Sequence, residues 1–393
     1  MTTDFTDISA LLGLKSLWDE SLRDPGVCVA VLDGLVDQSH PCFDGANLTR
    51  LPTLVSGFAD RGFASQHGTH VASIIFGQHD SPVRGIAPNC QGLIVPVFTD
   101  GRDGELAPCS QIDLARAITQ AVEQGANVIN ISDGQLAASP ESDPFLANAV
   151  RLCQENNVLI VAAAGNDGCD CLHVPAALES VLAVGAMDAQ GNPIGFSNWG
   201  EAYQNQGILA LGENILGAIP GGGTAAKTGT SFATPIVSGI VALLLSIQRQ
   251  QGKNPNRYAV RDAILQSALP CNQPKGSNSR RCLVGTLNIS GAYALITKGE
   301  IEPMTNEKPE EVTMQPSEAD NTIAQLQPSE TINLSLEQPV PQSSGIGVQA
   351  AEAQTSTSVP TAMSMGGNPM MATPSYNTNA AVTPSECATC ESN

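Results

Sequence analysis

The stretch VCVAVLDG, residues 27–34, is apolar at every position until it reaches an aspartate, Asp33. Because both faces of this segment are apolar, it is typical of a parallel strand that is covered by helices on both sides. Similar apolar segments and two segments with helical periodicity follow it along the chain. The alternation predicts an α/β fold with three layers and a mostly parallel central sheet. The further strands are expected at 93–98, 127–132, 158–164 and 181–186, and the helices at 112–124 and 144–156.

The composition of the chain changes near residue 300. Residues 301–393 contain ten prolines, one aromatic residue (Tyr376), and 11 acidic residues against one basic residue (Lys308). Such a segment cannot build a core and is typical of a disordered tail or linker rich in Pro, Gln, Ser and Thr. We therefore expect an N-terminal lead-in at 1–26, a folded domain at 27–300, and a tail at 301–393 that is able to tether a further domain or a pathway enzyme.

The charge of the chain restricts its partners and its location. The formal net charge of −20 argues against binding to nucleic acid and to anionic membranes. The N-terminus has no basic region followed by a long apolar run, as a secretory signal would. The most apolar stretch, 239–247, is expected to be too short to span a bilayer. These features predict a cytoplasmic protein whose 11 cysteines are mostly free thiols.

Three short motifs predict nucleophilic chemistry. Asp33 ends the first strand, His67 in HGTHVA (67–72) precedes an apolar helix, and Ser231 in GTSFATP (229–235) lies at the start of another helix. Acyl transfer needs a nucleophile, a base within hydrogen-bond reach, and a carboxylate that orients the base. We expect Ser231 to give its proton to His67 while Asp33 holds the other imidazole nitrogen.

A fourth motif, VAAAGN (161–166), ends a buried strand at Asn166, whose amide can face a developing oxyanion. With their order along the chain, the four motifs resemble the subtilisin family over roughly residues 25–295. The resemblance implies a subtilisin-like fold and a serine endopeptidase with Asp33, His67 and Ser231 as its triad. It also implies that Asn166 and the backbone N–H of Ser231 form the oxyanion hole.

Nearby residues offer alternatives to these assignments. His70 competes with His67, and Asp37 with Asp33, but His67 matches the base of the family, and Asp33 ends an apolar strand whereas Asp37 lies in a loop. His40-Pro41 matches a structural pair. The remaining alternative for Asn166 is that it only caps a turn.

The resemblance also places the specificity pocket. Two backbone stretches form its walls in the family, and His173 falls near its base. A side chain at Gln135, where many relatives have glycine, is expected to narrow the mouth and offer an amide, unless it points to solvent. We therefore predict a small or polar residue before the cut bond. The expected substrate-binding residues are Ser132, Asp133, Gly134, Gln135, Ala164, Gly165 and His173.

The chain departs from the family at several positions. Gly34 replaces the Ser or Thr that usually follows the aspartate, so one hydrogen bond to Asp33 is expected to be missing. Cys42 replaces a calcium-binding acid, and 78–85 lacks the Asn-rich calcium loop, so we expect no metal and no cofactor. The other cysteines near these motifs are interpreted as structural (Cys169 and Cys171), as a candidate disulfide (Cys271 and Cys282), or as inert (Cys387 and Cys390).

Four stretches (40–54, 156–178, 196–200 and 266–272) are similar to one subgroup, the N-terminal proteases of cyanobactin biosynthesis. That resemblance implies a peptide substrate, a ribosomal precursor cut before its core. The sister enzyme that macrocyclises carries an insertion between its aspartate and histidine, and here that interval is only 34 residues, which favours hydrolysis. A general intracellular protein-degrading subtilisin and an inactive peptide-binding scaffold remain as alternatives.

Overall fold

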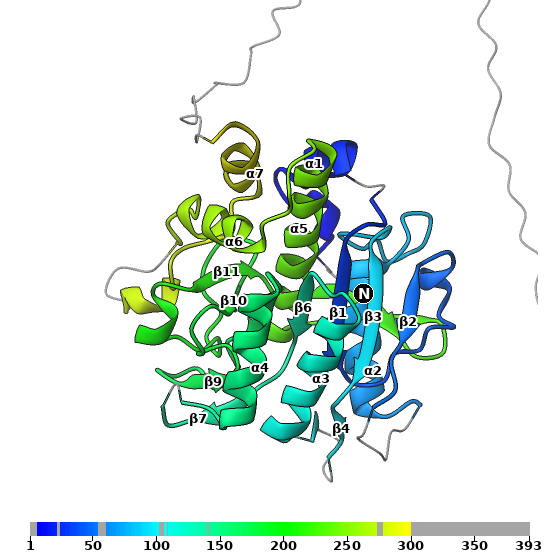
Figure 1. Cartoon of the computed structure of the whole chain (residues 1–393), viewed down its shortest axis with the longest axis horizontal. Coiled ribbons are helices and arrows are strands. Elements are labelled where there is room, and N and C mark those ends of the chain that lie inside the picture. Colours follow the sequence, from blue (N-terminus) through cyan, green and yellow to red (C-terminus); the bar gives the residue numbers. More distant parts are fainter. Residues whose placement is uncertain are drawn as a thin grey trace, which may run out of the picture. The chain divides into compact units, whose positions relative to one another are not determined.

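The computed structural model describes residues 6–299 except 22–23, 54–59, 102–105, 108, 140 and 273–277. The predicted tail at 301–393, which includes Cys387 and Cys390, lies outside the described residues. Strands and helices alternate along most of this part of the chain (Figure 1).

A seven-stranded sheet organises the described part of the chain. Its strand order is β11-β10-β8-β6-β1-β3-β2, and every neighbouring pair is parallel. All five predicted strands are present within two residues of their expected bounds, and β2 and β11 add to them at the two edges. The predicted α/β fold with a parallel central sheet is therefore confirmed. The strands are β1 (Cys28–Asp33), β2 (Leu48–Arg50), β3 (Gln91–Pro96), β6 (Val128–Ile131), β8 (Leu159–Ala163), β10 (Leu182–Met187) and β11 (Gly207–Leu211).

Helices cover both faces of this sheet and form two separate cores. Alternate residues of β1 face opposite sides: Val29 and Val31 belong to one core, and Ala30 and Leu32 to the other. Helices α3 and α4 pack side by side on the face shown toward the viewer in Figure 1. The opposite core is built around α2 and α5. The helices are α1 (Leu14–Ser21), α2 (Phe63–Phe76), α3 (Gln111–Glu123), α4 (Pro144–Glu155), α5 (Thr230–Gln250), α6 (Arg257–Gln266) and α7 (Ile289–Lys298).

Short strands form three antiparallel pairs outside the seven-stranded sheet. β4 pairs with β5, β7 with β9, and β12 with β13. The strands are β4 (Thr99–Asp100), β5 (Leu106–Ala107), β7 (Gln135–Ala137), β9 (Leu172–Val174), β12 (Ile215–Ile219) and β13 (Gly223–Lys227), and the 3-10 helices are Ile8–Ala10, Pro41–Phe43, Glu201–Tyr203 and Ser279–Cys282.

The N-terminal lead-in is part of the folded unit. Leu14 and Leu17 of α1 are fully buried in the core around α5. Trp18 Nε1 donates a hydrogen bond to the carbonyl oxygen of Ile86 at 2.8 Å. Removing α1 would therefore expose apolar surface of α5 to water, so residues before β1 contribute to the stability of the domain.

Helix α5 is much longer than the apolar run that the sequence singles out at 239–247. Its 21 residues, with a mean hydropathy of 1.9 in the most apolar window, are long and apolar enough to cross a membrane. However, 94% of that window is buried within the fold, where α5 lies against α2 and the strands β6, β8 and β10. Its hydrophobic character is explained by its position at the centre of one core.

Candidate functional site

Asp33 and His67 meet where β1 ends against α2. His67 Nδ1 lies 2.8 Å from Asp33 Oδ1, and both side chains are almost completely buried. The carboxylate can only accept, so Nδ1 carries the proton and Nε2 of the neutral ring is left as an acceptor. This tautomer is the one that a base needs if Nε2 is to take a proton from a nucleophile.

Gly34 explains how the helix that carries His67 reaches Asp33. A Cβ atom on Gly34 would overlap the backbone carbonyl of Ala64 in the first turn of α2, and one on Gly68 would lie 2.5 Å from the carbonyl oxygen of Gly34. The two backbones therefore touch where the family usually has a Ser or Thr side chain. Asp33 Oδ1 accepts from the N–H of Gly34 at 2.6 Å, and its Oδ2 has no hydrogen-bond partner among the described residues.

Thr230, the residue before Ser231, holds the side chain of Asn166. Asn166 Oδ1 accepts hydrogen bonds from the backbone N–H and the hydroxyl of Thr230, both at 3.0 Å. Because the Thr230 N–H can only donate, this contact decides which end of the amide is which, and Nδ2 is left free to donate. Nδ2 lies next to Gly229, 3.6 Å from where a Cβ on that glycine would be.

Ser231 is the second residue of α5, so its backbone N–H has no partner within the helix. The structure shows no hydrogen bond between its hydroxyl and His67 among the described residues. Phe232, the residue after Ser231, connects α5 to α2, because its ring centroid lies 5.5 Å from that of His67. The helix N-terminus also supplies positive potential at Ser231.

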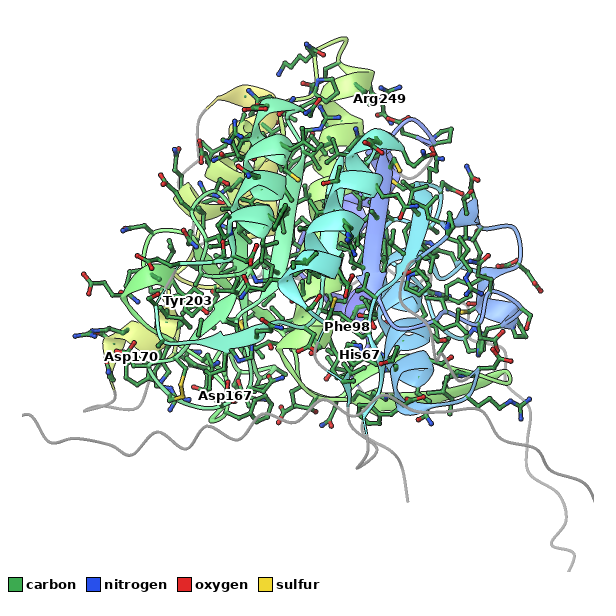
Figure 2. The ribbon with its side chains drawn as sticks, turned by 60° about the horizontal axis from the view of Figure 1, so that its bottom comes forward. His67, Phe98, Asp167, Asp170, Tyr203 and Arg249 are labelled. Carbon is green, nitrogen blue, oxygen red and sulfur yellow. A yellow bond between two sulfur atoms is a disulfide. The ribbon has the colours of Figure 1, made fainter. Side chains whose placement is uncertain are left out.

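These residues gather at one end of the sheet. Asp33 ends β1, Asn166 follows β8 by three residues, and the start of α5 lies beside them. Figure 2 shows His67 and Asp167 along one edge of the fold, with Arg249 of α5 at the opposite edge. In a parallel sheet the carboxyl ends of the strands are where reactive groups collect. This geometry can activate a serine hydroxyl and stabilise an oxyanion.

Comparison with known proteins agrees with this geometry. The sequence model of the Subtilase family matches residues 24–315. The chain belongs to the subtilase family.

Two solved structures and one curated relative show how close this subtilase is to known members. Prenylagaramide maturation protease PagA is 62% identical, with a TM-score of 0.68 over 73% of this chain and 99% of that chain. Patellamide maturation protease PatA is 61% identical, with a TM-score of 0.65 over 70% of this chain and 98% of that chain. The thermophilic serine proteinase of Bacillus sp. (strain AK1) is 36% identical over 253 residues, which are 64% of this chain and 58% of that relative. The subtilase thus spans little more than half the length of this relative.

Two glycines form facing walls of the predicted specificity pocket in this subtilase. Gly165 has a φ of +102°, and a Cβ there would collide with the side chains of Asn198 and His173. A Cβ on Gly134 would lie 3.3 Å from His173 Cβ and 3.4 Å from its Nδ1. The imidazole of His173 therefore lies between Gly134 and Gly165, and its place at the base of a specificity pocket stays a prediction.

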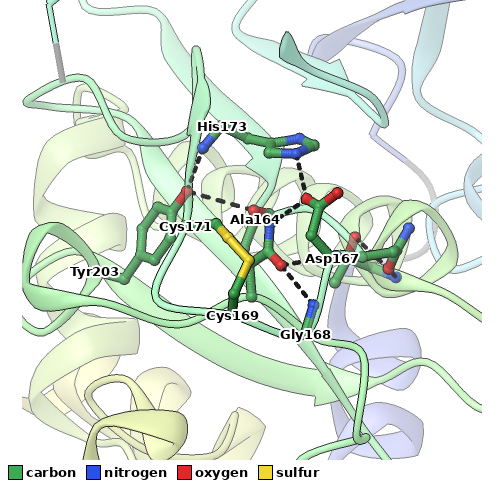
Figure 3. Close-up of polar contacts among 10 residues, drawn as sticks. Ala164, Asp167, Gly168, Cys169, Cys171, His173 and Tyr203 are labelled. Atoms are coloured by element: carbon green, nitrogen blue, oxygen red, sulfur yellow. Dashed lines mark hydrogen bonds and ion pairs between the residues drawn. A yellow bond between two sulfur atoms is a disulfide. The ribbon is translucent and has the colours of Figure 1, made fainter. Parts of the chain in front are cut away.

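A hydrogen-bonded network holds His173 in this position (Figure 3). His173 Nε2 lies 2.7 Å from Asp167 Oδ2, and its backbone N–H donates to the hydroxyl of Tyr203, which donates in turn to the carbonyl of Ala164. The Asn198 amide also donates to Asp167, and these hydrogen bonds, with Asn198 first, lower the pKa of Asp167. An ionised Asp167 accepts the proton of Nε2, which leaves Nδ1 on the side of Gly134.

The structure also describes the other residues that were predicted to line the pocket. Ser132 is buried, with its hydroxyl accepting from Asn130, and Ala164 is fully buried. Burial raises the pKa of Asp133. The Gln135 amide is bonded within the protein: its Nε2 donates to the carbonyl of Cys109 at 2.6 Å, and its Oε1 accepts from Gln111. Its amide is therefore occupied within the protein, so it is not available to a substrate without breaking these bonds.

The competing residues have structural roles in the subtilase. His70 is buried against Gly217 and hydrogen-bonded to the carbonyl of Ala225, and burial lowers its pKa to about 3, so it stays neutral. Asp37 accepts hydrogen bonds from Ser39 and from the N–H of Gly221 and so fastens two loops together. His40 bonds the carbonyl of Gly223.

The cysteines divide into two groups. Cys169 pairs with Cys171, and Cys271 with Cys282, as disulfides. Five of the nine described cysteines are free, and the candidate disulfide between Cys271 and Cys282 is present. Burial raises the pKa of the remaining thiols in the described part of the chain to about 12, which makes them poor nucleophiles. They are Cys28, Cys42, Cys90, Cys109 and Cys153.

No three His, Cys, Asp or Glu side chains gather into a metal-ligating cluster within the described ranges. The absence of a structural metal in the subtilase stays a prediction.

Sequence reasoning missed the residues that position the site rather than form it. Thr230 fixes Asn166, and Asn198, Asp167 and Tyr203 fix His173. Two of these lie directly beside a predicted residue: Thr230 precedes Ser231, and Asp167 follows Asn166. Asn198 and Tyr203 are about 30 residues away from their partners, so only the fold brings them together.

Proposed function

We propose that this subtilase is a serine endopeptidase that cleaves a ribosomal precursor peptide N-terminal to its core, in a cyanobactin-type maturation. The observation that carries the proposal is the 2.8 Å bond between His67 and Asp33, formed beside an Asn166 amide that Thr230 fixes next to Ser231. The substrate class is supported by the high identity to two maturation proteases, PagA and PatA.

In the proposed reaction, His67 Nε2 takes the proton of the Ser231 hydroxyl, and the oxygen attacks the peptide carbonyl. Asp33 stabilises the imidazolium that forms. Asn166 Nδ2 and the Ser231 N–H donate hydrogen bonds to the oxyanion and so stabilise the transition state of this attack. His67 then protonates the leaving amine, and water hydrolyses the acyl-enzyme by the same route in reverse.

The other parts of the proposal concern the chain around this site. We assign residues 27–300, together with the lead-in at 1–26 that contains α1, to the peptidase, and residues 301–393 to a tethering tail. The compartment is proposed to be the cytoplasm, without nucleic acid or membrane partners, as the acidic net charge supports.

The test is mass spectrometry of a candidate precursor peptide incubated with the full chain and with Ser231→Ala. We expect one cut directly before the core, two fragments whose masses sum to the precursor plus one water, and no turnover by the variant. Removing the hydroxyl opens no large cavity, so the variant should stay folded. Turnover by Ser231→Ala within tenfold of wild type would overturn the assignment of the nucleophile.

The same assay separates the alternatives. A cyclic product without added water indicates a macrocyclase. Broad digestion of casein indicates a general degrading enzyme. A failure of the wild-type protein to react with a serine-directed fluorophosphonate indicates a peptide-binding scaffold.

A further inference from the structure

Lys227 places a positive charge beside the candidate triad of a strongly acidic protein. It is the last residue of β13, whose alternate positions 223, 225 and 227 face the protein while 224 and 226 are exposed. Its Nζ lies 5.5 Å from the centre of the Phe63 ring and 5.9 Å from that of Phe232. Phe63 begins the helix of His67, and Phe232 follows Ser231, so Lys227 lies between the two elements that carry the base and the nucleophile.

The ammonium group of Lys227 has no carboxylate partner at ion-pair distance among the residues that the structure describes. Burial lowers its pKa, and the charge of Asp33 acts in the opposite direction. The faces of the two aromatic rings stabilise a cation, but they do not neutralise it. A partly desolvated and uncompensated cation gains free energy when an incoming carboxylate pairs with it.

The position of Lys227 also decides which part of a substrate can reach it. The acyl carbonyl has to lie at the oxyanion donors, Asn166 Nδ2 and the Ser231 N–H, whereas the leaving amine has to lie over His67. Phe232 packs against His67, 5.5 Å from ring to ring, and Lys227 lies over Phe232. The chain that leaves with the amine therefore passes Phe232 and meets Lys227.

We propose that Lys227 is a specificity-determining residue that binds a substrate carboxylate within the first three residues after the cut bond. The preferred substrate class is then a peptide with Asp or Glu on the leaving-group side. The inference rests on the proposed peptidase function but concerns a selectivity that this function does not itself require.

The experiment uses quenched fluorescent peptides that are identical before the cut bond and carry Glu, Gln or Lys at each of the three positions after it. The full chain is compared with Lys227→Met, with Lys227→Glu, and with Lys15→Met, a matched control that removes the same charge from an exposed position on α1. We expect wild type and the control to favour Glu over Gln in kcat/KM by about five- to tenfold at one position, which corresponds to roughly 1 kcal/mol.

This ratio should fall to about one in Lys227→Met, and the Lys peptide should become the better one for Lys227→Glu. Added salt should lower the wild-type ratio, since a partly exposed pair is screened. An unchanged ratio in Lys227→Met, or a wild type without Glu preference at all three positions, overturns the proposal. If Lys227→Met does not fold, Lys227→Gln and the wild-type ratio decide. Failure of the peptidase function itself has a different signature: no cleavage of any peptide, or cleavage that survives Ser231→Ala.

Discussion

Replacing Gly34 with serine, the type of residue that usually follows the catalytic aspartate in this family, should impair the enzyme. The serine Cβ would overlap the Ala64 carbonyl oxygen, at a separation far below the roughly 3.4 Å of an ordinary contact. Helix α2 has to move by more than about 1 Å to make room, and His67 moves with it. A misplacement of about 1 Å costs on the order of 10²-fold in rate, and overpacking costs about 1–3 kcal/mol of stability.

The assay is kcat/KM on the best peptide, together with urea unfolding of the same preparations. Gly195→Ala is the matched control, because no atom lies within 4 Å of the position of its Cβ and the backbone there is unstrained. The control should match wild type in both measurements. If Gly34→Ser keeps kcat/KM within threefold and loses less than about 0.5 kcal/mol, the close approach of β1 and α2 does not set the geometry of the site and the reasoning is refuted.

Two further predictions concern specificity and metals. His173→Ala should raise kcat/KM for peptides with Phe or Leu before the cut bond by about tenfold or more relative to the Ser peptide, because the imidazole no longer fills the space between Gly134 and Gly165. A peptide series that varies only the residue before the cut bond checks this. An unchanged preference contradicts it. EDTA should leave thermal unfolding unchanged, since the sequence at Cys42 and 78–85 lacks calcium ligands; a melting temperature lowered by more than about 5 °C, about 1 kcal/mol or more, would reveal a structural ion.

The fold could be predicted from the sequence because its central strands are apolar on both faces, as VCVAVL at 27–32 shows. The strands that could not be predicted are the edge strands and the short ribbons. β2 (Leu48–Arg50) has three residues, two of them exposed, and so has no apolar signal. β12 packs on α2, but its partner β13 has no buried residue. Periodicity reports burial, so elements that are barely buried leave little trace in the sequence.

The candidate site was predictable only where its residues lie within short motifs. Asp33 ends a strand, Asn166 follows one and Ser231 begins a helix, and local sequence indicates all three. The expectation that His67 precedes its helix is wrong, because α2 begins at Phe63 and His67 is its fifth residue. The network around His173 depends on Asn198 and Tyr203, whose positions relative to Asp167 are set by the packing of strands β8 and β10 and the loops that follow them. The hydrogen bonds of the Gln135 amide could not be predicted for a related reason: its partners, Cys109 and Gln111, belong to another segment.

The polar groups around the cut bond bear on the difference between a maturation protease and a degrading one. A wide apolar pocket accepts many side chains, because one methylene more or less changes binding by only about 1–3 kcal/mol. In the proposed specificity pocket the His173 imidazole, held by Asp167, lies between Gly134 and Gly165, so we expect a small residue to fit and a large apolar one to meet a filled space. Buried polar groups reject substrates that leave them unpaired, and by a larger margin than apolar walls do. Such a cleft would favour few sequences, which is the property that the proposed cleavage of a single precursor needs.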